Sequence, residues 1–156
     1  MSLEQILKKE YLNENLQAKN KNEALDELAD IVIKGPLKLS KLQVYDALLQ
    51  REKLGSTGIG DGVAIPHGKI GNLEQVIVAF GRSKNGVVFD SIDGKPVHIF
   101  FLLLAPENST SQHLKTLAKI CRMLKVDNFR KRLMAAESND DLYEIIIEED
   151  KEHPNP

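Results

Sequence analysis

The chain has 156 residues, of which 42% are hydrophobic and 28% charged, and this balance indicates one globular domain with one hydrophobic core. Its net charge of −2 and its lack of tryptophan argue against a nucleic-acid partner, because phosphate binding and base stacking need basic and aromatic side chains. Cys121 is the single cysteine, which excludes an internal disulfide and favours a reducing, cytoplasmic compartment.

The first part of the chain predicts two amphipathic helices. In residues 23–33, apolar side chains recur at spacings of three and four, and the Gly-Pro pair at 35–36 ends the pattern. Ser40 is a suitable N-cap and Gln43 completes a possible capping box, so a second helix is expected over residues 40–54. We expect this second helix to bury Leu42, Tyr45, Leu48 and Leu49.

The middle of the chain predicts strands. Residues 63–66 form a short candidate strand, residues 75–81 are rich in β-branched side chains, and residues 87–90 give a weaker signal. The most apolar run, VHIFFLLLA at 97–105, is too short to cross a bilayer, so residues 97–104 are expected to be a buried strand. The first 15 residues include acidic side chains and no long apolar core, so neither a signal peptide nor membrane insertion is expected.

Polar residues 107–112 offer N-caps for a further helix. Its expected apolar stripe consists of Leu114, Leu117, Ala118, Cys121 and Leu124. Asp127 and Asn139 can cap two more helices, and the charged residues 151–156 are expected to form a flexible C-terminal tail. Helices and strands thus alternate, which predicts an α/β fold over residues 1–150: a single domain with a mixed β-sheet flanked by helices.

Residues 55–71, GSTGIGDGVAIPHGKIG, contain six of the ten glycines in the chain. They do not form a nucleotide phosphate loop, because Gly68-Lys69 is followed by isoleucine, and the dinucleotide fingerprint fails because Val63 stands where its third glycine belongs. No G-x-S-x-G nucleophile elbow is present. The histidines are too far apart in sequence to predict a zinc site; they are His67, His98, His113 and His153.

His67 is the chemically distinctive residue of this run. Glycines permit positive φ angles and the close approach of another molecule, and Pro66 restricts the backbone directly before the histidine. A neutral imidazole has a free nitrogen lone pair, so it can accept a phosphoryl group and pass it on. The alternative is a histidine in a tight turn without a chemical role. The hydroxyls of Ser56 and Thr57 could be activated, but no catalytic triad is evident beside them.

The segment EKLGSTGIGDGVAIPHG, residues 52–68, resembles the active-site signature of the IIA components of the fructose/mannitol class in the bacterial phosphoenolpyruvate-dependent phosphotransferase system. The matching positions are Glu52, Ile59, Gly60, Val63, Ala64, Ile65, Pro66, His67 and Gly68. Similarity continues through FDSIDGKPVHIFFLLLAP, SQHLKTLAKI and FRKRLMAAESNDDLYEII, and it covers about residues 5–148. Within the class, GSTGIG, GVAIPHGKI and LLLAP are most similar to the nitrogen-related regulatory IIA proteins.

The resemblance implies the type-2 IIA fold, which is shared by phosphotransferase and anion transport proteins, and a phosphotransferase component that works through a phosphohistidine. It implies that His67 accepts the phosphoryl group on Nε2, that Arg51 and His113 are the other site residues, and that the loop of Gly55, Ser56 and Thr57 lines the phosphate site. The implied donor is a phosphohistidine carrier of the HPr type. The implied recipient is a regulated target protein or a IIB component, and neither a cofactor nor a metal is needed.

The residue types suit these roles. A guanidinium stays charged and can hold two phosphate oxygens, although Arg51 could equally be a solvated charge near a helix end. His113 falls in the first turn of its predicted helix, where the helix dipole disfavours a protonated imidazole and free backbone amides can bind an anion. The alternative for His113 is a histidine that flanks the core.

Three further hypotheses about the function stay open. The chain could be a sugar-specific IIA component for fructose or mannitol, which passes the phosphoryl group to a IIB cysteine. It could be a binding module whose histidine is no longer phosphorylated, although Arg51, His67 and His113 are all present. Zinc binding by the histidines is the least favoured reading. His98, in the apolar strand, and His153, near the C-terminal end, are expected to have no part in the site.

Overall fold

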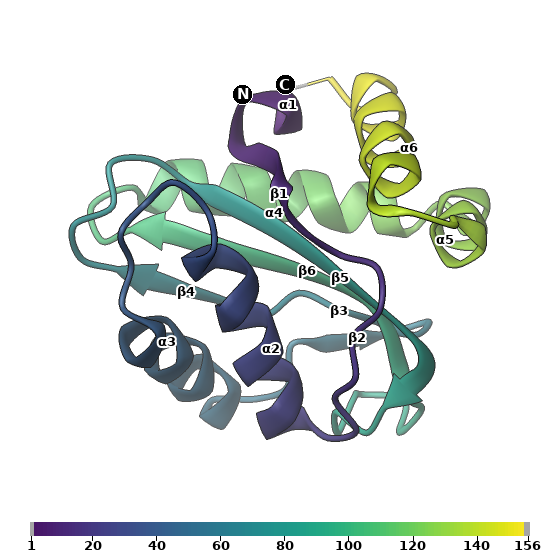
Figure 1. Cartoon of the computed structure of the whole chain (residues 1–156), viewed down its shortest axis with the longest axis horizontal. Coiled ribbons are helices and arrows are strands. Elements are labelled where there is room, and N and C mark those ends of the chain that lie inside the picture. Colours follow the sequence, from purple (N-terminus) through teal and green to yellow (C-terminus); the bar gives the residue numbers. More distant parts are fainter. Residues whose placement is uncertain (1, 155–156) are drawn as a thin grey trace.

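The computed structural model describes residues 2–154, and Figure 1 shows helices and strands interspersed along the chain. The elements are, in order, α1 (Leu3–Ile6), β1 (Leu7–Asn13), α2 (Lys21–Ile33), α3 (Lys41–Lys53), β2 (Gly58–Gly60), β3 (Val63–Ala64), β4 (His67–Ile70), β5 (Ile77–Val87), β6 (Val97–Pro106), α4 (Thr110–Leu124), α5 (Asp127–Ala135) and α6 (Asn139–Lys151).

The strands of the described residues form one six-stranded mixed sheet in the order β1-β5-β6-β3-β2, and β4 also pairs with β6. β5 and β6 are antiparallel, whereas β1 runs parallel to β5, and β3 and β4 run parallel to β6. The central strand β6 is the apolar run that the sequence predicts, and all its residues except His98 are buried. The predicted α/β fold with a mixed sheet flanked by helices is confirmed.

Helices cover both faces of the sheet. Figure 1 shows α2 and α3 on one face and α4 on the other, with α5 and α6 following α4. α2 packs on β1 and β5, α3 packs on β4, and α4 packs on β6. Since β4 begins at His67, the contact between α3 and β4 brings the end of α3 to this histidine.

The prediction for the buried face of α3 is partly wrong. Ser40 caps the helix as expected, since its Oγ accepts a hydrogen bond from the backbone N–H of Gln43. Leu48 is buried, but Leu42 is 69% exposed, and Tyr45 and Leu49 are only partly buried. The other buried residues of α3 are Val44 and Glu52. They lie four residues from Leu48 on either side, so they share its face of the helix.

The predicted apolar stripe of α4 is also wrong, except for Leu124. Leu114 is 59% exposed, Ala118 is exposed, and Leu117 and Cys121 are only partly buried. The buried face of α4 consists of His113, Thr116, Lys119, Ile120, Met123 and Leu124. Polar side chains can be buried on this face because they find partners: Thr116 Oγ1 donates to the carbonyl of Gln112, and Lys119 forms an ion pair with Asp150 of α6.

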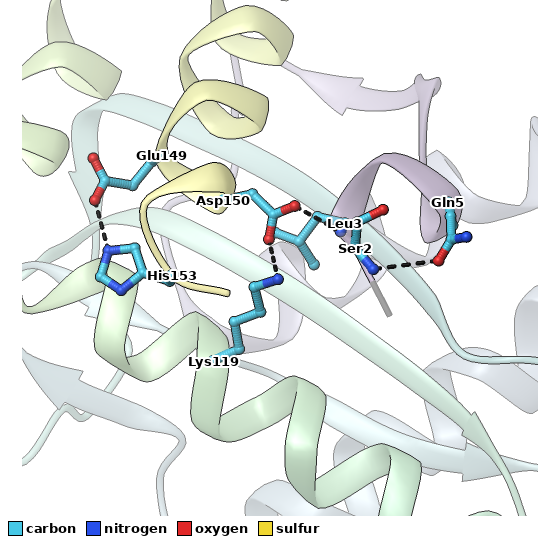
Figure 2. A network of polar contacts seen from close by, with 7 residues as sticks. All are labelled: Ser2, Leu3, Gln5, Lys119, Glu149, Asp150 and His153. Carbon is cyan, nitrogen blue, oxygen red and sulfur yellow. Dashed lines mark hydrogen bonds and ion pairs between the residues drawn. The ribbon is translucent and has the colours of Figure 1, made fainter. Parts of the chain in front are cut away.

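The ion pair of Lys119 and Asp150 belongs to a buried network that joins three helices (Figure 2). Lys119 and Asp150 are 3% and 4% exposed. The other carboxylate oxygen of Asp150 accepts a hydrogen bond of 3.0 Å from the backbone N–H of Leu3, the first residue of α1. The two ends of the described chain are thereby fastened to α4, the helix that carries His113.

The sequence patterns predicted no counterpart of α1, β1, β2 or β4, and other element boundaries differ modestly from the predictions. β5 continues beyond residue 81 to Val87, and Val88 forms only an isolated bridge, with Asn20, in place of the weak strand expected over 87–90. The N-caps of α5 and α6 are Val126 and Ser138, each one residue before the expected cap. Of the expected tail, Lys151 ends α6 and His153 contacts Glu149, whereas residues 155–156 lie outside the described residues. The flexibility of the tail stays a prediction.

Candidate functional site

The glycine-rich segment forms a tight hairpin that leads into His67. β2 and β3 are joined by Asp61 and Gly62, which have φ angles of 56° and 77°. A positive φ at both positions suits a two-residue hairpin turn, and glycine takes this conformation without a steric cost. β3 then runs into Pro66, and His67 opens β4, where it pairs with Leu103 of the central strand. The histidine is therefore fixed at the start of a strand and is only partly buried.

Both ring nitrogens of His67 have protein partners. Nδ1 lies 2.8 Å from the carbonyl oxygen of Ile65, and Nε2 lies 3.1 Å from Nε of Arg51. A carbonyl oxygen can only accept, so Nδ1 carries the proton, and the Arg51 Nε–H donates to the lone pair of Nε2. The two contacts require the same neutral tautomer, in which Nε2 is the unprotonated, nucleophilic nitrogen.

Arg51 lies in the last turn of α3 and is held from two sides. While its Nε donates to His67, its Nη1 donates a hydrogen bond of 2.9 Å to the carbonyl of Gly55. The guanidinium is thus oriented by the loop that follows its own helix. Arg51 is paired with the predicted site histidine and is not an isolated surface charge.

The structure also brings His113 to His67, although the two lie far apart in the sequence. Their rings meet edge to face, with centroids 5.3 Å apart and an interplanar angle of 83°. His113 is 7% exposed, and its buried Nδ1 has no hydrogen-bond partner among the described residues. Close by, Nζ of Lys69 on β4 donates to Thr110 Oγ1, at the first residue of α4. All three residues predicted from the sequence, Arg51, His67 and His113, therefore converge.

Burial keeps both imidazoles neutral. It is the main cause that lowers the pKa of His67 below 6.5, and the Arg51 cation lowers it further, while the Ile65 carbonyl and the Glu52 charge act in the opposite direction. Burial also lowers the pKa of His113, with further contributions from His67 and Lys69. Near pH 7, the cluster therefore combines unprotonated imidazoles with the fixed positive charge of Arg51.

The predicted phosphate-site loop has mainly a supporting position. Gly55 offers its carbonyl to Arg51. Ser56 Oγ donates to the carbonyl of Phe89 and accepts from the N–H of Gly58. Thr57 is 4% exposed, and its hydroxyl donates to Glu52. Because both hydroxyl hydrogens point to protein acceptors, direct contact of this loop with a phosphate stays a prediction.

The sequence predicted no role for Glu52 or Lys69. Glu52 appeared only as a matching position of the signature, yet its carboxylate is buried, at 6% exposure, beside the loop that orients Arg51. The available signal was its place four residues after Leu48, on the buried face of α3. Lys69 lies two residues after His67 on β4. Alternation along a strand puts the two side chains on the same face.

Exposed apolar side chains occur close to the site residues in the sequence. Leu54, Ile59 and Leu114 are 84%, 45% and 59% exposed, and they follow Glu52, precede Gly60 and adjoin His113, respectively. Val63 and Ile65 are 1% and 2% exposed, so they anchor the hairpin in the core and do not form part of an outer surface.

The other histidines are held elsewhere. Nδ1 of His98 contacts the carbonyl of Ser83 at 2.8 Å, and Nε2 of His153 contacts Glu149 at 2.7 Å. Across residues 2–154, no group of three or more His, Cys, Asp or Glu side chains has an arrangement that could hold a metal ion. Within the same range, no helix combines the length and the apolar character needed to cross a membrane.

Residues 5–149 match the family described as the phosphoenolpyruvate-dependent sugar phosphotransferase system, EIIA 2. The chain is 38% identical over 149 residues to the nitrogen regulatory protein of Klebsiella oxytoca, with 95% of this chain and 91% of that protein covered. It is 39% identical over 152 residues to the fructose-specific EIIABC component of Bacillus subtilis strain 168. That match covers 97% of this chain, which spans only 24% of the larger protein.

The fold agrees with a solved structure of a relative. The crystal structure of the nitrogen regulatory protein IIA-Ntr from Neisseria meningitidis superposes with a TM-score of 0.85 at 36% sequence identity. The superposition covers 92% of this chain and 98% of that protein.

Proposed function

Because the chain belongs to the EIIA 2 family of the phosphoenolpyruvate-dependent sugar phosphotransferase system, we propose that it is a phosphoryl carrier that accepts a phosphoryl group on Nε2 of His67. The observation that carries the proposal is the pair of contacts on the His67 ring, Nδ1 to Ile65 and Nε2 to Arg51. They leave Nε2 with a lone pair and place a cation beside it, which is the pairing that phosphoryl acceptance needs.

The donor is a phosphohistidine carrier of the HPr type, itself charged from phosphoenolpyruvate through enzyme I. In the transfer, the Arg51 N–H first releases the lone pair of His67 Nε2. The lone pair then forms a new N–P bond while the N–P bond of the donor breaks, and the electron pair of the old bond stays on the donor imidazole. The proton on Nδ1 does not move. The Ile65 carbonyl that accepts it stabilises the positive charge that the ring acquires on phosphorylation.

The neighbouring side chains stabilise the negative charge of the phosphoryl group. In the unphosphorylated protein, the Arg51 N–H faces Nε2. Once phosphorus is bonded to Nε2, this N–H can donate to a phosphoryl oxygen. His113 can add a donor from its neutral ring, which lies edge to face with His67. Phosphoryl transfer depends mainly on such positioning and charge stabilisation, and a phosphohistidine donor is already activated, so the step requires no metal or cofactor.

We assign the chain to the regulatory, nitrogen-related branch, in which the phosphorylation state controls the binding of a target protein. This assignment is supported by the similarity to the Klebsiella nitrogen regulatory protein, which is 38% identical and is matched over 91% of its length. A second candidate is a sugar-specific IIA component that passes the group to a IIB component. The similarity to the Bacillus fructose-specific protein favours it, although this chain spans only 24% of that protein.

The phosphoryl-carrier proposal is tested by intact-mass spectrometry. The wild-type protein and a His67→Ala variant are incubated with phosphoenolpyruvate, enzyme I and an HPr-type carrier whose own phosphorylation is verified in the same sample. Wild type should gain one phosphoryl group and His67→Ala none. If wild type stays unmodified while the carrier is phosphorylated, the proposal fails.

The two branches differ in the recipient of the phosphoryl group. A regulatory protein should leave sugars unphosphorylated when it is combined with IIB- and IIC-containing membranes, and its capture of a target protein should differ between the two phosphorylation states. Transfer to fructose or mannitol in the membrane assay would instead establish the sugar-specific branch.

A further inference from the structure

Glu52 is a buried carboxylate in the last turn of α3, directly after Arg51. Both of its oxygens accept hydrogen bonds from Thr57: the backbone N–H donates at 3.0 and 2.9 Å, and the hydroxyl at 2.7 and 3.1 Å. A buried carboxylate costs free energy unless it is hydrogen-bonded, so the charge of Glu52 is supported by this one residue of the loop. The bonds fix the loop to the end of the helix.

Thr57 also connects Glu52 to the hairpin. Its carbonyl accepts a hydrogen bond of 3.0 Å from the backbone N–H of Ile65. The carbonyl of the same Ile65 accepts from Nδ1 of His67 at 2.8 Å. A continuous chain of hydrogen bonds therefore runs from the Glu52 carboxylate through Thr57 and Ile65 to the imidazole.

The hydrogen-bond chain closes into a ring because Glu52 and Arg51 are joined by a peptide bond. Arg51 contacts the opposite nitrogen of the same imidazole, Nε2, at 3.1 Å. It also contacts Gly55, two residues before Thr57. One end of α3 thus determines what each nitrogen of His67 meets: Arg51 directly at Nε2, and Glu52 through Thr57 and Ile65 at Nδ1.

We propose that Glu52 is a positioning residue. Through the hydrogen bonds of Thr57 and Ile65, it holds His67 in the Nδ1–H tautomer and keeps Nε2 of His67 within hydrogen-bond distance of Arg51. The inference deepens the proposed function and rests on it for the catalytic consequence. A carboxylate suits this role because both its oxygens are acceptors and Thr57 offers two donors. An amide at position 52 would turn its NH₂ group toward one of these donors, which would free the loop and the Ile65 carbonyl to shift.

The test combines a structural readout with a kinetic one. Imidazole ¹⁵N and ¹H NMR reports the tautomer of His67 without any partner protein, and the rate of phosphoryl acceptance from the HPr-type carrier reports the chemistry. The variants are Glu52→Gln, which keeps the shape but removes the charge, and Thr57→Val, which removes the hydroxyl alone. Thr57→Ser restores the hydroxyl, and Glu74→Gln, at an exposed carboxylate in the loop between β4 and β5, is the matched control.

Wild type and Glu74→Gln should show the Nδ1–H tautomer of His67. Glu52→Gln should show a mixture of tautomers and accept the phosphoryl group at least about tenfold more slowly, which corresponds to about 1.4 kcal/mol. Thr57→Val should change in the same direction but less, and Thr57→Ser should recover wild-type behaviour. Because Thr57→Val and Thr57→Ser give their own answer, the proposal stays testable if Glu52→Gln does not fold.

A wild-type tautomer and wild-type rate in folded Glu52→Gln, or in folded Thr57→Val if the first variant does not fold, would overturn the proposal. So would a tautomer mixture in Thr57→Ser equal to that in Thr57→Val. If wild-type His67 accepts no phosphoryl group at all, the proposed function fails, but the NMR comparison still decides whether Glu52 positions the ring.

Discussion

Nε of Arg51 donates a hydrogen bond of 3.1 Å to Nε2 of His67, sixteen residues farther along the chain. The contact identifies the unprotonated nitrogen of the histidine and places a permanent positive charge beside it. Because α3 packs on β4, the strand that His67 opens, the pairing is a direct product of the fold. The same nitrogen and the same cation are the parts that the proposed phosphoryl transfer needs.

Replacement of Arg51 by glutamine should slow phosphoryl acceptance on the order of a hundredfold, because a positioned charge that stabilises the transition state is removed. Arg51→Lys should fall between wild type and Arg51→Gln, since a lysine keeps the charge but lacks the planar fork of the guanidinium. The measurement is the rate at which the intact mass of the protein increases when a phosphorylated carrier is supplied at fixed concentration.

Lys53→Gln is the matched control for Arg51. Lys53 is a basic residue in the same last turn of α3 and is exposed. Its loss changes the net charge by the same amount as Arg51→Gln but removes no partner of His67. Equal slowing in Lys53→Gln and Arg51→Gln would show that only the general positive charge of this helix end matters, which contradicts a specific role for Arg51.

The central part of the fold could be predicted from local sequence patterns. The run at 97–105 is highly apolar and too short to cross a bilayer, which favoured a buried strand, and the structure has β6 there. Proline and glycines around His67 predicted a rigid presentation of the ring. The positive φ angles of Asp61 and Gly62 form a tight hairpin turn before it, and the rigidity stays a prediction. The wider resemblance to the family added Arg51 and His113, which lie outside the signature at 52–68 and whose distances from His67 in the sequence carry no local signal.

What could not be predicted depends on partners that are distant in the sequence. On α4, the predicted stripe through Leu114 and the observed buried face through His113 both follow helical spacing, so periodicity alone could not choose between them. The deciding contacts are the edge-to-face contact with the His67 ring and the carboxylate of Asp150, which make the burial of His113 and Lys119 possible. Likewise, Glu52 on the inner face of α3 is explained only by its bonds to Thr57.

Phosphoryl acceptance should decline in mild acid. The pKa of His67 is lowered below 6.5, chiefly by burial, so the ring is neutral and nucleophilic at pH 7 and above. As the pH falls through this lowered pKa, protonation removes the lone pair of Nε2 and the rate should fall in proportion to the neutral fraction. The pH-rate profile for acceptance from a fixed, pre-phosphorylated carrier measures this. NMR titration of His67 in the free protein should give the same midpoint, and a midpoint above 6.5 would contradict the burial argument.

The stability of the protein should also fall as the pH drops below 6.5. His67 and His113 both have a folded-state pKa below their ordinary value of 6.5. Between that value and the lowered pKa, the unfolded chain binds protons that the folded protein does not, so acid favours unfolding. Each histidine contributes a slope of at most about 1.4 kcal/mol per pH unit, and neither contributes above about pH 7.5.

Urea unfolding at a series of pH values checks this dependence. The variant His113→Gln should flatten the slope below pH 6.5, because one of the two groups that titrate in this way is absent. The comparison uses slopes and not absolute stabilities, so a general loss of stability in the variant does not obscure the result. An unchanged slope in His113→Gln would show that His113 binds its proton equally well in the folded and the unfolded protein.

Loss of one partner of the buried ion pair between α4 and α6 should destabilise the whole protein. In Lys119→Met, the carboxylate of Asp150 would keep the N–H of Leu3 but lose its countercharge in a site that is 4% exposed, at a cost of about 3 kcal/mol. The double variant Lys119→Met with Asp150→Leu should recover part of this loss, because no buried charge then remains unpaired.

Lys115→Met, at an exposed position one turn earlier on α4, is the control and should change the free energy of unfolding by less than about 0.5 kcal/mol. The measurement is the free energy of unfolding in urea for the four proteins. A double variant less stable than Lys119→Met would show that Asp150 contributes mainly through its bond to Leu3, with the ion pair secondary.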